Sequence, residues 1–161
     1  MQHLIEKNWN TGSDKVVDFY EILKIVKTHT LKGSKIFIGS DSFLTNKKVC
    51  FASAICLYGG EDPSRYFFFR ENLNNQSFKV LISRITEETR RSVELACLLM
   101  EEYNFDPSLI ELHLDVSPFS AGTATSKFSD MLKGYVQGYG FECKIKPNAW
   151  ASQSIADRHS K

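Results

Sequence analysis

The sequence has few of the residues that would set it apart from ordinary globular proteins. Its four cysteines form no Cys-x-x-Cys pair, which argues against a zinc site and favours buried, reduced thiols. Four prolines and nine glycines are too few for a collagen-like or low-complexity chain. No internal repeat is visible. We therefore expect a globular protein whose core needs no covalent cross-links.

The chain also lacks a long hydrophobic run and an excess of charge of either sign. No apolar stretch approaches the ~18 residues that a membrane span requires. The first ten residues lack the basic and apolar regions of a signal peptide, so we expect a cytoplasmic protein with no membrane partner. Twenty basic residues stand against 19 acidic ones, for a net charge of +1. Any binding of nucleic acid must therefore depend on a local basic patch.

The 161 residues, 42% of them hydrophobic, alternate between strand and helix patterns. Helical periodicity of apolar residues predicts helices over 16–28, 82–103, 127–139 and 149–159. Apolar or alternating runs predict strands over 35–40, 49–58, 65–70, 110–116 and 141–146. Short connections make the first three strands an antiparallel meander. The last two are each reached through a helix, which favours parallel pairing. The predicted fold class is α/β, with a mixed five-stranded sheet flanked by helices.

We expect a single domain over residues 1–161, with an N-terminal helical extension (1–34) and a core (35–161). The two loop-like stretches within the core, 60–64 and 72–77, are too short to act as domain linkers.

Two aspartates stand at the ends of predicted strands. Asp41 directly follows the first strand, and Asp115 comes just before Ser117-Pro118 ends the fourth. Aspartate is disfavoured within strands, so each is either a turn residue or a carboxylate held where α/β sheets place their sites. If the two strands are neighbours, the carboxylates repel each other unless they share a divalent cation such as Mg²⁺.

Two further acidic residues lie in predicted helices, where the pattern alone gives them no special role. On a helical projection Glu94 falls on the polar side with Glu87 and Arg91, which is typical of a solvated glutamate. Asp157, beside Arg158, is typical of an exposed helical residue.

Taken in order, these four acidic residues resemble the set found in the ribonuclease H-like superfamily, and more narrowly in its YkuK-like family. The resemblance extends from about residue 35 to residue 161. It rests on the motifs IGSDS (38–42), RSVELA (91–96), LHLDVSP (112–118), KGYVQGYGFECKIKPNAWA (133–151) and IADRHSK (155–161). It implies a β-β-β-α-β-α-β-α core, which agrees with the pattern of strands and helices above.

The resemblance also implies a function. Asp41, Glu94, Asp115 and Asp157 would be the catalytic ligands of two Mg²⁺ or Mn²⁺ ions, and the protein a metal-dependent nuclease acting on phosphodiester bonds. If Glu94 points away from Asp41, then Glu87 or Glu88 is the next candidate. Two alternatives stay open: a non-catalytic module that binds nucleic acid or protein on the same scaffold, and a hydrolase of a small phosphate ester.

Several residues near these acids are candidates for binding substrate. Lys146, Arg158 and Lys161 would form a phosphate-binding patch, with Ser42 beside Asp41 and His159 two residues beyond Asp157. A solvated face is an equally good interpretation of the basic residues. His113, on the polar side of a central strand, is expected to be a core histidine bonded to a neighbour.

Overall fold

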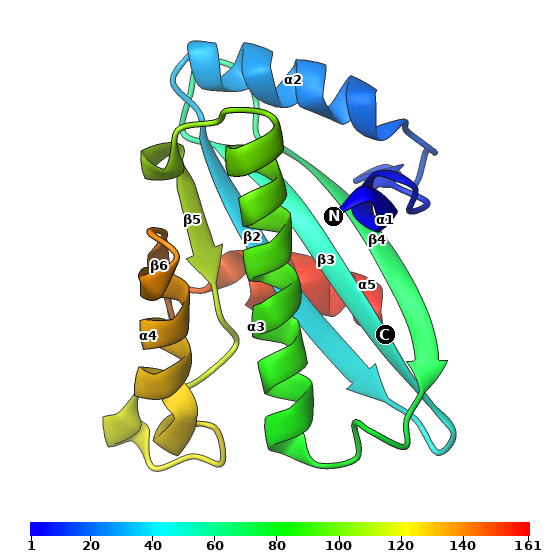
Figure 1. The fold of residues 1–161 in the computed structure, drawn as a ribbon, viewed down its shortest axis with the longest axis vertical. Coiled ribbons are helices and arrows are strands. Elements are labelled where there is room, and N and C mark those ends of the chain that lie inside the picture. The colour runs from blue at the N-terminus through cyan, green and yellow to red at the C-terminus, as the bar shows by residue number, and fades with distance from the viewer.

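The computed structural model describes residues 1–161 and contains a six-stranded mixed sheet with helices on both faces (Figure 1). The strands are β1 (Asn10–Thr11), β2 (Lys35–Leu44), β3 (Lys48–Tyr58), β4 (Arg65–Asn74), β5 (Ile110–His113) and β6 (Glu142–Lys144). Their order across the sheet is β1-β4-β3-β2-β5-β6. All five predicted strands are present. The sixth, β1, has only two residues and therefore no periodicity by which the sequence could reveal it.

The strand pairing confirms the predicted fold class. The strands β2, β3 and β4 form an antiparallel meander. Two parallel pairings, of β2 with β5 and of β5 with β6, complete the mixed sheet. The short strand β1 adds antiparallel to the outer edge of β4. The strands β2 and β5 therefore lie side by side and run in the same direction. The prediction that Asp41 follows its strand is wrong, because pairing with β3 continues to Leu44 and leaves Asp41 within β2.

The helices are α1 (Gln2–Ile5), α2 (Phe19–Leu31), α3 (Leu81–Cys97), α4 (Ser129–Gly138) and α5 (Asp157–Ser160). Helix α3 continues as a π-helical turn over Leu98–Glu102, and a second π-helical segment, Ala151–Ala156, runs directly into α5. Helix α2 begins three residues later than predicted. The Asp18 side chain accepts a 2.7 Å hydrogen bond from the Tyr20 backbone N–H and so caps the helix.

The two faces of the sheet are covered unequally. Helices α2, α3 and α4 lie over one face, where the main cluster of 26 buried side chains packs (Figure 1). Residues 151–160, which we call the C-terminal helix, lie behind the sheet in this view. This second face has a smaller buried cluster of five residues: Phe37, Ala54, Cys56, Phe68 and Ala151.

Gly39 lets the C-terminal helix lie directly on β2. A Cβ atom at Gly39 would come within 2.5 Å of the carbonyl carbon of Ala151, so only glycine permits this approach. The buried ring of His113 fixes the start of the same helix. Its Nδ1 accepts a 3.0 Å hydrogen bond from the Ala151 N–H, and its Nε2 lies 2.6 Å from Glu111 Oε2. His113 is thus the core histidine that the sequence predicts.

All four cysteines are free thiols, and Cys56, Cys97 and Cys143 are buried. Burial raises the pKa of Cys143 to about 11. None of the helices combines the length and the hydrophobicity needed to cross a bilayer.

Candidate functional site

Asp41, Asp115 and Asp157 meet at the carboxyl end of β2, on the second face of the sheet. Asp41 is only 6% exposed, and its Oδ2 accepts a 3.5 Å hydrogen bond from Ser160 in the C-terminal helix. Burial raises the pKa of Asp41 to about 8, with added contributions from a hydrogen bond to Asp157 and from the charge of Asp115. The structure therefore brings together three of the four acidic residues singled out in the sequence.

The fourth carboxylate at this site belongs to Glu88 of α3. Glu88 is 8% exposed, and its Oε1 accepts a 2.6 Å hydrogen bond from the hydroxyl of Ser42, the residue after Asp41. Burial raises the pKa of Glu88 well above its ordinary value, and the negative charges of Asp41 and Asp115 raise it further. Asp41 and Asp115 therefore lie within electrostatic reach of Glu88, although Ser42 and α3 are on the opposite face of the sheet from the Asp41 side chain.

A chain of three buried serines explains how α3 presents Glu88 to β2. The Ser92 hydroxyl donates a 2.9 Å hydrogen bond to Ser40, and the Ser40 and Ser53 hydroxyl oxygens are 2.8 Å apart. Ser92 lies one helical turn after Glu88, while Ser40 and Ser42 share one side of β2. The Ser92–Ser40 and Glu88–Ser42 contacts are therefore successive contacts of one helix with one strand.

Glu94, the glutamate implied by the family resemblance, lies elsewhere on α3. Its carboxylate is bound by Arg90 at 2.8 Å and by His3 at 2.9 Å. Six residues separate it from Glu88, which turns its side chain about 240° around the helix axis. The structure does not place Glu94 beside Asp41.

The sequence does contain a signal for Glu88. On the helical projection it falls on the apolar side of α3 with Ile85, Ser92 and Ala96, all of which are buried. A carboxylate on the buried side of a helix needs a reason to be there, because an unpaired buried charge is costly. The charge on the apolar side of this helix is thus a sequence signal for the buried carboxyl group of Glu88.

Lysines form ion pairs with two of the four carboxylates. Lys146 Nζ lies 2.9 Å from Asp115 Oδ1, and Lys161 Nζ lies 3.1 Å from Asp157 Oδ2. Asp41 and Glu88, the two most buried members of the set, form no ion pair. The raised pKa values of Asp41 and Glu88 therefore favour protonated, neutral carboxyl groups in the deepest part of the site, with the charge of Arg84 acting in the opposite direction at Glu88.

His159 and Arg158 border the site on the side of β4. The His159 ring stacks on Phe68 with 3.5 Å between centroids, and its Nε2 lies 2.9 Å from the Tyr66 hydroxyl. Burial lowers the pKa of His159; the charge of Asp14 opposes this, and the charges of Arg158 and Arg70 lower the pKa further. Both arginines therefore lie within electrostatic reach of this ring.

The donor set suits a divalent cation by its chemistry. As the side chains stand, no three acidic, histidine or cysteine groups form a group that could hold a metal ion. Even so, the site gathers carboxylate oxygens, which Mg²⁺ prefers, around an Asp41 whose pKa is raised mainly by burial and further by Asp157 and Asp115. A bound divalent cation would favour the ionised carboxylates and reduce the repulsion between them.

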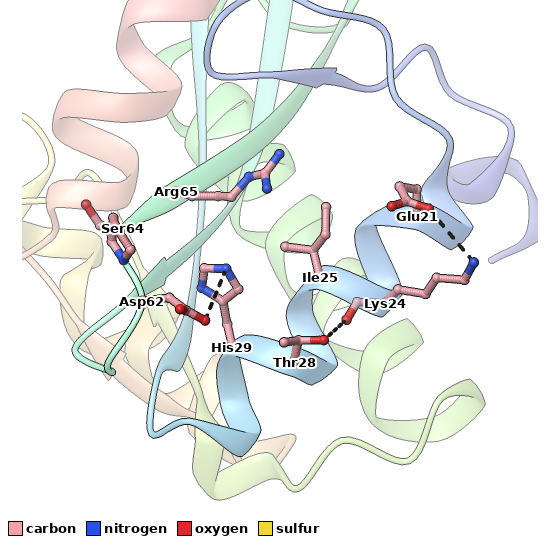
Figure 2. Close-up of a pocket in the computed structure, with 9 residues that line it drawn as sticks. Glu21, Lys24, Ile25, Thr28, His29, Asp62, Ser64 and Arg65 are labelled. Atoms are coloured by element: carbon pink, nitrogen blue, oxygen red, sulfur yellow. Dashed lines mark hydrogen bonds and ion pairs between the residues drawn. The ribbon is translucent and has the colours of Figure 1, made fainter.

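A polar pocket of 530 Å³ opens elsewhere in the molecule, between α2 and the turn that joins β3 to β4 (Figure 2). Its charges are of both signs and face one another. His29 lies 4.0 Å from Asp62, and Lys24 lies 4.0 Å from Glu21. None of the four carboxylates lines this pocket, so it is separate from the candidate site.

Comparison with known proteins agrees with this fold. The family model described as "Ribonuclease H-like" matches residues 18–161, and the chain therefore belongs to the ribonuclease H-like family. No curated protein matches the sequence. The narrower resemblance to the YkuK-like family is consistent with this result and stays a prediction.

Proposed function

We propose that this protein is a divalent-metal-dependent nuclease that hydrolyses phosphodiester bonds in nucleic acid. The observation that carries the proposal is the buried, unpaired carboxylate of Asp41 with Asp157 and Asp115 around it. The proposed ligands of two Mg²⁺ or Mn²⁺ ions are Asp41, Asp115 and Asp157, as predicted from the sequence. Glu88 takes the place of Glu94, because it lies against Ser42 at the same site.

In this proposal some residues supply negative charge for the metal ions, and others orient those residues or bind phosphate. When bound, the metal ions would activate a water for attack on phosphorus and stabilise the leaving 3′ oxygen. Asp41 and Glu88 supply the negative charge that holds them, and the Ser42 hydroxyl fixes the Glu88 carboxylate. Lys146 and Lys161 lie at the rim, where release from Asp115 and Asp157 frees them to contact a phosphate.

Cleavage of labelled RNA, DNA and RNA–DNA hybrid in Mg²⁺ or Mn²⁺ tests the proposal. Asp41→Asn and Asp115→Asn should abolish cleavage while the protein remains folded, because each removes a ligand charge but keeps the side-chain shape. Glu88→Gln should abolish it too, whereas Glu94→Gln, on the same helix, should cleave like the wild type. Undiminished cleavage by Asp115→Asn would overturn the mechanism. Loss in Glu94→Gln with retention in Glu88→Gln would restore Glu94 as the ligand.

The lysine pairs on Asp115 and Asp157 favour one other candidate, a non-catalytic module that binds nucleic acid or protein on the same scaffold. In such a protein the lysines would stand permanently where a metal ion would otherwise neutralise the carboxylates. Calorimetry with Mn²⁺ separates the two. Clear Mn²⁺ binding that weakens in Asp41→Asn supports the nuclease, whereas no Mn²⁺ binding together with nucleic-acid binding supports the module. Turnover of mononucleotide analogues alone would point instead to a small phosphate ester as substrate.

A further inference from the structure

The second face of the sheet carries aromatic and basic side chains beside the C-terminal helix. The strand register places them in rows. Tyr58 lies opposite Lys35, and Tyr66 lies opposite Cys56 in the next row. Two rows further on, Arg70 lies opposite Ala52, which in turn lies opposite Asp41. Because residues two apart on a strand share a face, these side chains are on the same face as Asp41.

An apolar pocket of 560 Å³ opens where β3 ends, β4 begins and the C-terminal helix starts. Tyr58, Tyr66, Trp150 and Ile155 are among its lining residues. Tyr58 is 59% exposed, and its ring lies edge-on to Trp150 with centroids 5.9 Å apart. The pocket thus offers aromatic surface to a planar ligand.

Two exposed arginines, Arg70 and Arg158, lie near the carboxylates: Arg70 is in the row of Asp41, and Arg158 follows Asp157 in the C-terminal helix. The ion-paired arginines of the chain are Arg90 and Arg91, so Arg70 and Arg158 have no acidic partner. Arg70 is two strands away from Asp41 in the same row, a distance of about 10 Å at the usual strand spacing. Both are therefore free to bind phosphates of a strand that reaches the carboxylate site.

We propose that this face binds single-stranded nucleic acid, with one base in the pocket that Tyr58 and Trp150 line and the backbone passing Arg70 and Arg158 toward Asp41. The proposal rests on the proposed nuclease function and names its substrate class. The row of Tyr58 is six residues from the row of Asp41, or about 20 Å. At about 3.4 Å per stacked nucleotide, the path accommodates roughly six nucleotides.

The chemistry of the path selects a single strand over a duplex. Aromatic side chains bind bases through their ring faces, and those faces are already stacked and covered in a double helix. The basic groups on the path are separate arginines on one narrow face, which suits one backbone rather than two. The pocket and the arginines together therefore favour an unpaired strand.

Binding of ten-nucleotide RNA and DNA oligonucleotides, measured with EDTA present, tests the proposal without requiring catalysis. Trp9 is fully buried, so quenching of tryptophan fluorescence reports contact at Trp150. Tyr58→Ala should weaken binding about tenfold, the scale of one lost base stack, whereas Tyr58→Phe should bind normally. Arg70→Ala should lower the slope of log K against log salt by about 0.7. Lys27→Ala, which removes an exposed cation from α2 on the opposite face, should leave that slope unchanged.

Equal affinity for a single strand and for its duplex would overturn the proposal, as would undiminished binding by both Tyr58→Ala and Arg70→Ala. A four-nucleotide strand that quenches Trp150 and binds as tightly as the ten-nucleotide strand would overturn the placement of the base. The nuclease function and the binding face can be tested separately. Single-strand binding that depends on Tyr58 and Arg70, with no cleavage in any divalent metal, removes the nuclease and keeps the binding face. Cleavage that these variants do not affect keeps the nuclease and removes the binding face.

Discussion

Lys146 reaches across from the segment after β6 to place its ammonium group 2.9 Å from the Asp115 carboxylate. The ion pair thus occupies an oxygen of Asp115. Under the proposed function a divalent cation and Lys146 would compete for this carboxylate, so Lys146, which is not one of the proposed ligands, would lower the affinity of the site for metal.

Lys146→Gln should tighten Mn²⁺ binding measured by calorimetry. The pair is partly exposed, with side chains 36% and 23% accessible, so the gain should be about 0.5–1 kcal/mol, or roughly two- to fivefold. Binding of nucleic acid should weaken and become less dependent on salt, because one phosphate contact is lost. Lys144→Gln is the matched control, since Lys144 pairs with Glu142. Weaker Mn²⁺ binding by Lys146→Gln would contradict this account of the pair.

The stability of the metal-free protein should depend on pH through Asp41. Its pKa in the folded state is about 8, against an ordinary value of 3.8 for an aspartate side chain. The folded state therefore holds this proton more tightly than the unfolded state does. The associated stabilisation is complete below about pH 4 and is lost as the pH rises toward 8. In Asp41→Asn this loss of folding stability should not occur, because the amide side chain does not titrate. Thermal unfolding in EDTA should show the variant gaining at least about 1.4 kcal/mol on the wild type over that range, one pKa unit's worth. Parallel pH profiles for the two proteins would contradict the raised pKa.

Added Mg²⁺ should reverse that order of stability. A ligand that binds only the folded state stabilises it by about 2.7 kcal/mol at 100 times its dissociation constant. The wild type should therefore gain thermal stability on titration with Mg²⁺, and Asp41→Asn should gain clearly less. Glu94→Gln serves as the control and should shift like the wild type. If Asp41→Asn and the wild type shift equally, Asp41 does not bind the ion.

Replacing Gly39 should loosen the C-terminal helix. The added Cβ of Gly39→Ala would collide with the backbone of Ala151 and Ser152, both within 2.5 Å. We expect a loss of about 1–3 kcal/mol in urea unfolding, the usual cost of overpacking. Gly134→Ala in α4 is the matched control, because its Cβ meets nothing within 4 Å and should stabilise the helix by up to about 1 kcal/mol. If Gly39→Ala leaves the free energy of unfolding unchanged, the C-terminal helix can move away from β2 at no cost.

The fold was largely accessible from the sequence because its strongest signals are local. The alternation in β5 and the apolar runs in β2 and β3 reflect burial on the faces of a sheet, so the pattern and the structure have the same cause. The start of α2 was harder to place. Helical periodicity begins at Val16, three residues before the first residue of the helix. Asp18 caps the helix, while Asp14 adopts a positive φ of 64° in the preceding turn.

The site was less accessible, because its residues come together only through tertiary contacts. Asp41 and Asp115 could be paired only on the condition that their strands are neighbours, which the pairing of β2 with β5 meets. Asp157 depended on the family resemblance, because its position is set by the approach of Ala151 to Gly39. Glu88 depends on Ser92 bonding to Ser40, a contact between residues 52 positions apart that no helical period reveals.

The parallel pairing of β2 with β5 also has a consequence for how the chain folds. Its register joins Ile36 to Ile110, across more than seventy intervening residues, whereas β2, β3 and β4 are linked by short turns. Closing so long a loop is entropically costly and slow compared with hairpin formation. The meander should therefore form first, and the strand carrying Asp115 should dock late. During synthesis, Asp41 should therefore be in a folded meander before Asp115 and Asp157 have joined it, because most of the chain must be made first.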